Sequence, residues 1–206
     1  MRLKKKVKVF IILLVVVALG VGGFFVYKKY FDNSVKEAKV IYKIKKYGYT
    51  LKDIKSLKYK KMFLELRDIL KMSEVDEDKY VKKISEMFIY DFYSLNDKTA
   101  KTDVGGTDFV YDKILDNFML NAEDTYYKYV ESNIYHQRKQ KLPMVNKVKI
   151  NSVEKTSFKY DDEVDEEAYE VKVSWDYTSS KYDSYQKEAT LVFIHDGIKL
   201  VLVELK

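Results

Sequence analysis

The sequence predicts an α+β fold: an N-terminal transmembrane helix, then helices packed on a C-terminal antiparallel sheet of about four strands. Three observations lead to this prediction. Residues 9–27 contain no charged side chain. Apolar residues between positions 50 and 134 recur at the spacing of amphipathic helices. From Val145 onward they alternate with polar residues, which is the period of a half-buried strand.

The uncharged stretch is long enough to cross a bilayer. Its nineteen residues, at about 1.5 Å each, would form a helix of about 29 Å, close to the hydrocarbon thickness. Lysines flank it, and the basic tail over residues 1–8 predicts a cytoplasmic N-terminus. We therefore expect a single-pass protein of the cell membrane with an extracytoplasmic C-terminal domain. The alternative is a signal peptide cleaved after Ala18-Leu19-Gly20, although the apolar run continues beyond that point.

Composition and charge exclude several classes of function. The chain of 206 residues has no cysteine, which excludes a disulfide framework and a thiolate metal site. Its formal charge of +6 comes from the first third of the chain, since residues 62–206 carry 21 basic and 29 acidic side chains. An acidic domain repels phosphate groups, so we expect no nucleic-acid partner. Lysine outnumbers arginine 35 to 3, a usage typical of low-GC bacterial genomes.

Between the membrane segment and the domain, the pattern predicts a basic juxtamembrane stalk over residues 28–48, leaving 49–206 for the α+β domain. Apolar residues at helical spacing predict a helix from Asp32 to Tyr47, and its other faces are rich in lysine. We interpret this helix as a solvated stalk. The alternative is a strip that lies against anionic lipid or wall polymer.

Four helices are predicted within the domain. Thr50, with Asp53 three residues later, begins one that continues to about Lys71. Asp76 or Ser73 caps the next one. A loop from Asn96 to Asp108 follows and contains two adjacent glycines. The last three helices are expected over Glu77 to Ser94, Phe109 to Leu120 and, capped by Asn121, Ala122 to Ile134.

The C-terminal third predicts the sheet. Val153 falls out of phase with Val148 and Ile150, which indicates a bulge near Asn151 and Ser152. In the strand over residues 169–177, which we call the Trp175 strand, apolar and polar residues alternate strictly, so that one side is polar. Asp196-Gly197 between two apolar strands predicts a tight hairpin. The buried side of the Trp175 strand is expected to hold Tyr169, Val171, Val173, Trp175 and Tyr177.

No motif identifies a catalytic residue, a cofactor-binding residue or a metal ligand. The acidic run from Asp161 to Glu167 lacks the glycine and the distal glutamate of a calcium loop, and we interpret it as a solvated hairpin tip. His136 and His195 show no spacing typical of a zinc site. Gly105-Gly106 lacks the Lys-Ser/Thr pair of a phosphate-binding loop. We therefore predict no catalytic residue, cofactor or metal.

Helices followed by a curved antiparallel sheet with a short Asp196-Gly197 hairpin resemble the NTF2-like cone fold. With a basic tail, one membrane helix and a stalk in front, the layout is similar to VirB8-like proteins of type IV secretion and conjugation systems. The stretches Asp103–Phe109 and Lys139–Pro143 are similar to uncharacterised clostridial membrane proteins. The resemblance implies a non-enzymatic, membrane-anchored binding or assembly subunit. The alternative is a small pocket-type ligand-binding protein or enzyme on the same fold.

Two partners are therefore expected: the lipid bilayer, through residues 9–27, and a protein partner or a second copy of the chain. The polar side of the Trp175 strand is the candidate docking surface. The alternative function predicts instead a deep apolar cavity between helices and sheet. The candidate surface comprises Glu170, Lys172, Ser174 and Asp176.

Overall fold

The computed structural model describes residues 20–23, 38–160 and 162–206. The chain divides into two compact units, Met1–Glu37 and Ala38–Lys206. In the first unit residues 20–23 are helical, and no helix among the described residues is long and apolar enough to cross a membrane. The rest of the predicted membrane segment, and the predicted stalk up to residue 37, lie outside the described residues.

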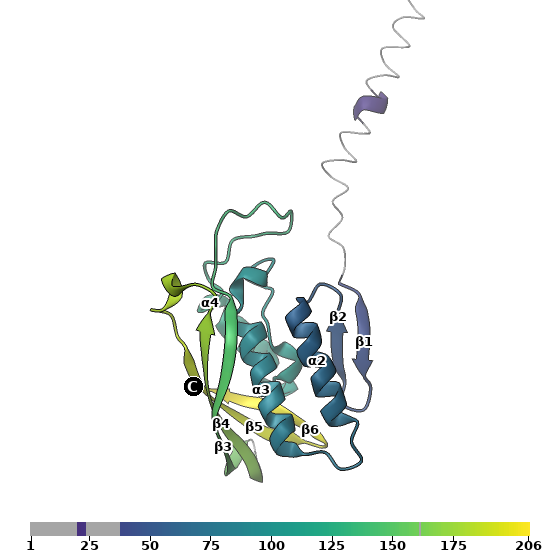
Figure 1. Cartoon of the computed structure of the whole chain (residues 1–206), viewed down its shortest axis with the longest axis vertical. Coiled ribbons are helices and arrows are strands. Elements are labelled where there is room, and N and C mark those ends of the chain that lie inside the picture. Colours follow the sequence, from purple (N-terminus) through teal and green to yellow (C-terminus); the bar gives the residue numbers. More distant parts are fainter. Residues whose placement is uncertain (1–19, 24–37, 161) are drawn as a thin grey trace, which may run out of the picture. The chain divides into compact units, whose positions relative to one another are not determined.

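The second unit contains two antiparallel sheets, and Figure 1 shows α2 and α3 between them. The four-stranded sheet has the order β3-β4-β5-β6. The small sheet pairs β1 (Val40–Ile44) with β2 (Tyr49–Lys52). The helices are α2 (Leu57–Leu70), α3 (Glu77–Tyr93) and α4 (Asp112–Asp124). The large sheet comprises β3 (Val145–Tyr160), β4 (Glu163–Tyr177), β5 (Glu188–Asp196) and β6 (Lys199–Leu205).

The predicted fold class is wrong. A transmembrane helix followed by helices on one C-terminal sheet, as in an NTF2-like cone, leaves no place for the second sheet, and the described residues include no membrane-spanning helix. β1 occupies part of the expected helix from Asp32 to Tyr47. Gly48, with φ of 75°, closes the hairpin, and Tyr49 and Leu51 are buried on one side of β2. β1 and β2 are so short that apolar residues alternating along a strand also fit the spacing of a helix, which explains the wrong prediction.

The first helix of the domain begins later than predicted. Leu51 belongs to β2, and Asp53 accepts a hydrogen bond from the Lys39 amide at 2.9 Å instead of capping a helix. The N-cap of α2 is Ser56, whose hydroxyl accepts from the Tyr59 amide at 3.2 Å. The prediction for α3 is confirmed, including the Asp76 cap, which accepts from the Lys79 amide.

Of the two helices predicted over 109–120 and 122–134, the first is present as α4, shifted to Asp112–Asp124, and the second is wrong. One helix, α4, ends at Asp124, and the chain then turns. The buried Tyr127 explains the turn: its hydroxyl donates to the Phe92 carbonyl at 2.6 Å and accepts from the Gly105 amide at 3.0 Å. A continuous helix from Ala122 would carry this side chain away from both partners.

The four antiparallel C-terminal strands are confirmed. The register of β3 shifts between Ile150 and Ser152, where the bulge was expected, and Gly197 has the positive φ of the predicted tight turn. Only part of the acidic run lies at the hairpin tip, because β4 already begins at Glu163. The distal part of the β3–β4 hairpin packs a second apolar cluster, which includes Phe158, Ala168, Ile194 and Val201.

The main core lies between α3 and the large sheet. The predicted inner side of β4 is buried, and the Trp175 ring lies 4.3 Å from that of Tyr93. Phe92 contacts both Phe88 and Phe118, with ring centroids 5.4 Å apart in each pair. Large side chains of the described residues therefore fill the space in which a pocket-type enzyme would need its cavity.

Candidate functional site

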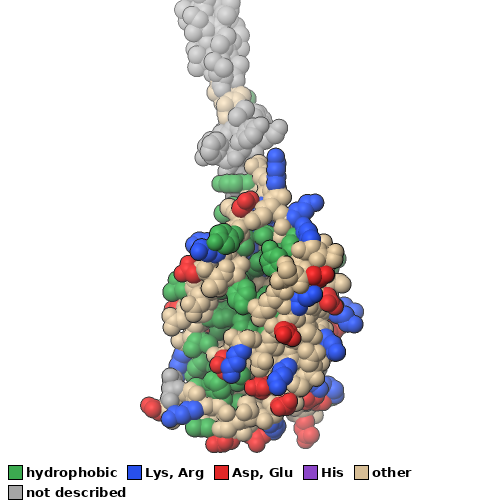
Figure 2. Space-filling model, turned by 90° about the vertical axis from the view of Figure 1, so that its left-hand side faces the viewer, with side chains coloured by type: hydrophobic (Ala, Val, Ile, Leu, Met, Phe, Trp, Pro, Cys, Tyr) green, Lys and Arg blue, Asp and Glu red, His purple; other side chains and the backbone are tan. Residues whose placement is uncertain are grey.

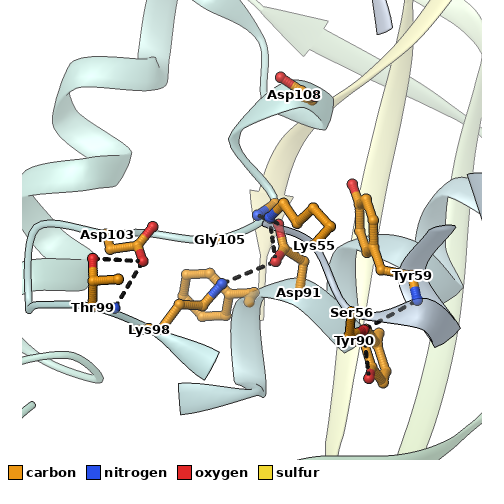
Figure 3. Close-up of polar contacts among 12 residues, drawn as sticks. Lys55, Ser56, Tyr59, Tyr90, Asp91, Lys98, Thr99, Asp103, Gly105 and Asp108 are labelled. Carbon is orange, nitrogen blue, oxygen red and sulfur yellow. Dashed lines mark hydrogen bonds and ion pairs between the residues drawn. The ribbon is translucent and has the colours of Figure 1, made fainter. Parts of the chain in front are cut away.

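The most buried carboxylate cluster centres on Asp91, in the last turn of α3. Asp91 is 8% exposed, and both of its oxygens lie 2.6 Å from the Lys55 ammonium. Lys98, 3% exposed, donates to it at 2.9 Å, and the Gly106 amide does so at the same distance. Figure 3 shows how the β2–α2 loop, α3 and the loop after it converge on this carboxylate.

The cluster keeps Asp91 ionised. Burial on its own would raise the pKa of Asp91, but the ammonium groups of Lys98 and Lys55 and the Gly106 amide outweigh burial and hold that pKa well below its usual range. Asp97 and Asp108 lie nearby with exposed side chains. The protein around them partly desolvates their carboxylates, which raises the pKa of each.

Gly105-Gly106 serves this cluster and does not cradle a phosphate. A Cβ at Gly105 would lie 2.2 Å from the Asp91 carbonyl oxygen, so only glycine fits against α3 there. Gly106 has φ of 75°, which glycine adopts without strain. Both amides already donate within the protein, to Tyr127 and Asp91 respectively.

A small polar cavity of about 190 Å³ opens beside the cluster. Its two lysines both pair with Asp91, and the lining also contains the carboxylates of Asp97 and Asp103, so acidic groups outnumber basic ones there. The cavity therefore offers little to an anionic ligand, and we interpret the cluster as a structural ion network. Its lining includes Ile54, Lys55, Ser56, Tyr90, Asp97 and Lys98.

The two histidines form no metal site among the described residues, which hold no group of three or more suitable ligands. His195 lies between two carboxylates: its Nδ1 is 2.9 Å from Asp165, and its Nε2 is 3.5 Å from Glu77. Partial burial would raise the pKa of Asp165, but hydrogen bonds from the His195 amide and imidazole and from the Glu167 amide lower it. Asp165 thus fastens the hairpin to β5 and is not part of a solvated tip.

The predicted docking surface does face away from α3. Glu170, Lys172, Ser174 and Asp176 alternate with the buried side of β4, and we call their side of the large sheet the outer face. Figure 2 views the domain from the side where β3 and β4 lie in Figure 1, and apolar side chains form a band there with charged ones around it.

A groove of about 640 Å³ hollows the outer face. Across it runs one row of register partners on three strands: Lys149 of β3 opposite Ser174 of β4, and Ser174 opposite Glu188 of β5. Neither Lys149 nor Glu188 forms an ion pair with another described residue. The exposed Tyr185 lies at the same groove.

Sequence reasoning missed Lys149 and Glu188 because strand register joins them to Ser174. It also missed Asp91, although a signal is present: Asp91 is the only charged residue in the otherwise apolar and aromatic run from Met87 to Tyr93. A charge at such a place needs a buried partner.

Comparison of the chain with protein-family models, curated proteins and solved structures gives no match.

Proposed function

We propose that this chain is a non-enzymatic assembly subunit. It is held at the cell membrane through residues 9–27, its domain is extracytoplasmic, and a second copy of the chain packs on the outer face of the sheet. The observation that carries the proposal is the row Lys149–Ser174–Glu188, in which opposite charges that form no ion pair with the described residues lie on either side of a small residue. A secretion or conjugation-type envelope machine is the setting we propose for this subunit.

The row is complementary to itself. A two-fold axis parallel to β4 and passing Ser174 exchanges the two sides of the groove, so Lys149 of each copy faces Glu188 of the other. Packed sheets lie about 10 Å apart, which Lys and Glu side chains can span together. The exposed Tyr185 supplies an apolar ring to fill the groove of the second copy.

The packing of the core favours assembly over the pocket-type alternative. An enzyme or ligand-binding domain of that kind needs a cavity between helices and sheet, with an isolated polar group inside. Aromatic side chains of the described residues occupy most of that space and leave a pocket of only about 220 Å³ beside Phe92, Phe118 and Leu205, whereas the larger groove lies on the opposite side of the sheet. The surface available to a partner is therefore the outer face.

Site-specific crosslinking tests the arrangement, and the absence of native cysteine makes single-cysteine variants clean. Ser174→Cys lies beside the proposed axis, so a short bis-maleimide should join two copies in intact membranes. Asp68→Cys, on the exposed side of α2, is the matched control and should remain monomeric. Equal crosslinking of the two variants, or none with Ser174→Cys, would contradict the proposed interface.

Charge reversal tests the pairing itself. Lys149→Glu and Glu188→Lys should each reduce crosslinking at position 174 several-fold, because each places like charges opposite one another. The double variant should restore it. Glu154→Lys combined with Lys149→Glu is the control: Glu154 also lies on the outer face, but in the row of Glu170, and should not rescue. If the Lys149–Glu188 exchange does not restore crosslinking at position 174, the proposed pairing of Lys149 with Glu188 across the two-fold axis is wrong.

A further inference from the structure

Four segments meet at the end of the domain where the loop between α4 and β3 lies in Figure 1: 38–41, 53–61, 96–103 and 126–142. We call their common surface the basic end. The Lys39 amide donates to Asp53, the Asn133 amide donates to the Thr99 carbonyl, and Arg138 donates to the Lys98 carbonyl. The polar cavity joins the second segment to the third.

Large apolar side chains are exposed at the basic end. Leu57, the first residue of α2, is 85% exposed, and Tyr129 is 77% exposed. Aliphatic side chains and tyrosines together are typical of surfaces that enter the interfacial region of a bilayer. The other exposed apolar residues of these segments are Val40, Ile41, Ile54, Tyr126, Ile134 and Tyr135.

The charge of the domain is strongly uneven. The four segments carry eleven Lys and Arg against four Asp and Glu, whereas the rest of 38–206 carries nineteen basic and twenty-six acidic residues. Nine of the eleven basic residues lie outside the Asp91 cluster. The domain is therefore neutral as a whole, with a positive end of +7 and a remainder of −7. Such an end is attracted to an anionic surface, and the remainder is repelled by it.

Chain connectivity favours a bilayer as that surface. Ten residues, 28–37, separate the uncharged stretch 9–27 from residue 38, and ten extended residues span at most about 36 Å. A bilayer that holds residues 9–27 is therefore always within reach, and the basic end is the part joined to it.

We propose that the basic end docks on the surface of an anionic lipid bilayer, with Leu57 and the exposed tyrosines in the interfacial region. The proposal rests on the membrane anchoring in the proposed function but not on the dimer. Docking would fix the orientation of the domain, with the hairpin tip of β3 and β4 pointing away from the membrane.

The test uses the full chain in vesicles that contain brominated lipid, either phosphatidylcholine alone or with phosphatidylglycerol. Leu57→Cys carries an environment-sensitive fluorophore, and Ser157→Cys, exposed near the distal end of β3, is the matched control. We expect at least threefold stronger quenching at position 57 in the anionic vesicles, with loss at high salt, and no change at position 157. Flotation of the vesicles measures anchoring separately.

Charge variants identify the cause. Lys61→Glu, Lys139→Glu and Lys141→Glu together should abolish quenching at position 57 while flotation persists. The control triple, Lys45→Glu, Lys71→Glu and Lys159→Glu, makes the same charge change at exposed sites outside the basic end and should leave quenching intact.

Each contrary result has a distinct meaning. Flotation without quenching at position 57 overturns the docking surface and leaves the anchor in place. Equal quenching in both kinds of vesicle overturns recognition by charge. A chain that floats with neither kind of vesicle overturns both the anchor and the docking surface.

Discussion

Asp91→Asn should destabilise the domain by about 3–5 kcal/mol, which is the usual cost of removing one partner from a buried ion pair. The surroundings of Asp91 explain why this variant should lose so much free energy of unfolding. Lys98 is 3% exposed and forms its ion pair among the described residues with Asp91, so the change leaves a buried ammonium without its counter-charge. Lys55 is more accessible and can regain water. Since domains are stable by only about 5–15 kcal/mol, the loss should be large.

Urea unfolding of the full chain in mild detergent measures the effect, with the fluorescence of the single tryptophan, Trp175, reporting on the core. Asp68→Asn, in an exposed ion pair with Arg67, is the matched control and should cost less than about 1 kcal/mol. Asp91→Leu combined with Lys98→Met should recover most of the loss, because both buried charges are then removed. If Asp91→Asn costs no more than the control, the cluster is not the structural network described above.

Four further predictions concern the same region. Because the pKa of Asp91 lies well below its ordinary value of about 3.9, its stabilisation should be present above that pH and lost as pH falls further, and Asp91→Asn should lack this loss in acid unfolding curves. The raised pKa values of Asp97 and Asp108 act with the opposite sign, giving stability that is lost as pH rises through them. Gly105→Ala should lower the unfolding midpoint markedly, since its Cβ would overlap the Asp91 carbonyl. Ser56→Ala should cost about 1 kcal/mol in the same urea assay through loss of the α2 cap.

The parts of the fold with long, regular patterns could be predicted from the sequence. α3 combines a capping aspartate with several turns of apolar periodicity, and β4 alternates over its buried half, so neither pattern fits another structure. β1 and β2 have five and four residues, too few to separate a strand from a helix. The turn after α4 depends on Tyr127, whose hydrogen-bond partners are far away in the sequence.

The candidate surfaces show the same limit. Alternation alone places Ser174 on the outer face, but its neighbours Lys149 and Glu188 follow only from the register of β3 and β5. The bulge between Ile150 and Ser152 makes this register hard to derive, because it exchanges inward and outward residues along β3. The basic end needs even longer connections, since Arg138 donates there to the Lys98 carbonyl forty residues away.

The two proposed surfaces constrain each other. Two copies held by one bilayer must present their basic ends to the same side, so their two-fold axis must run along the membrane normal. The start of β3 lies at the basic end, where Lys58 donates to the Asn146 carbonyl, and β4 therefore runs from the hairpin tip towards the basic end. An axis parallel to β4 meets this requirement and pairs Lys149 with Glu188. An axis across the strands, midway between the rows of Ser174 and Glu170, would pair Lys149 with Glu154 and turn one basic end away from the bilayer. Rescue of Lys149→Glu by Glu188→Lys but not by Glu154→Lys would therefore support both surfaces, and the reverse result would make them incompatible in a dimer on a single membrane.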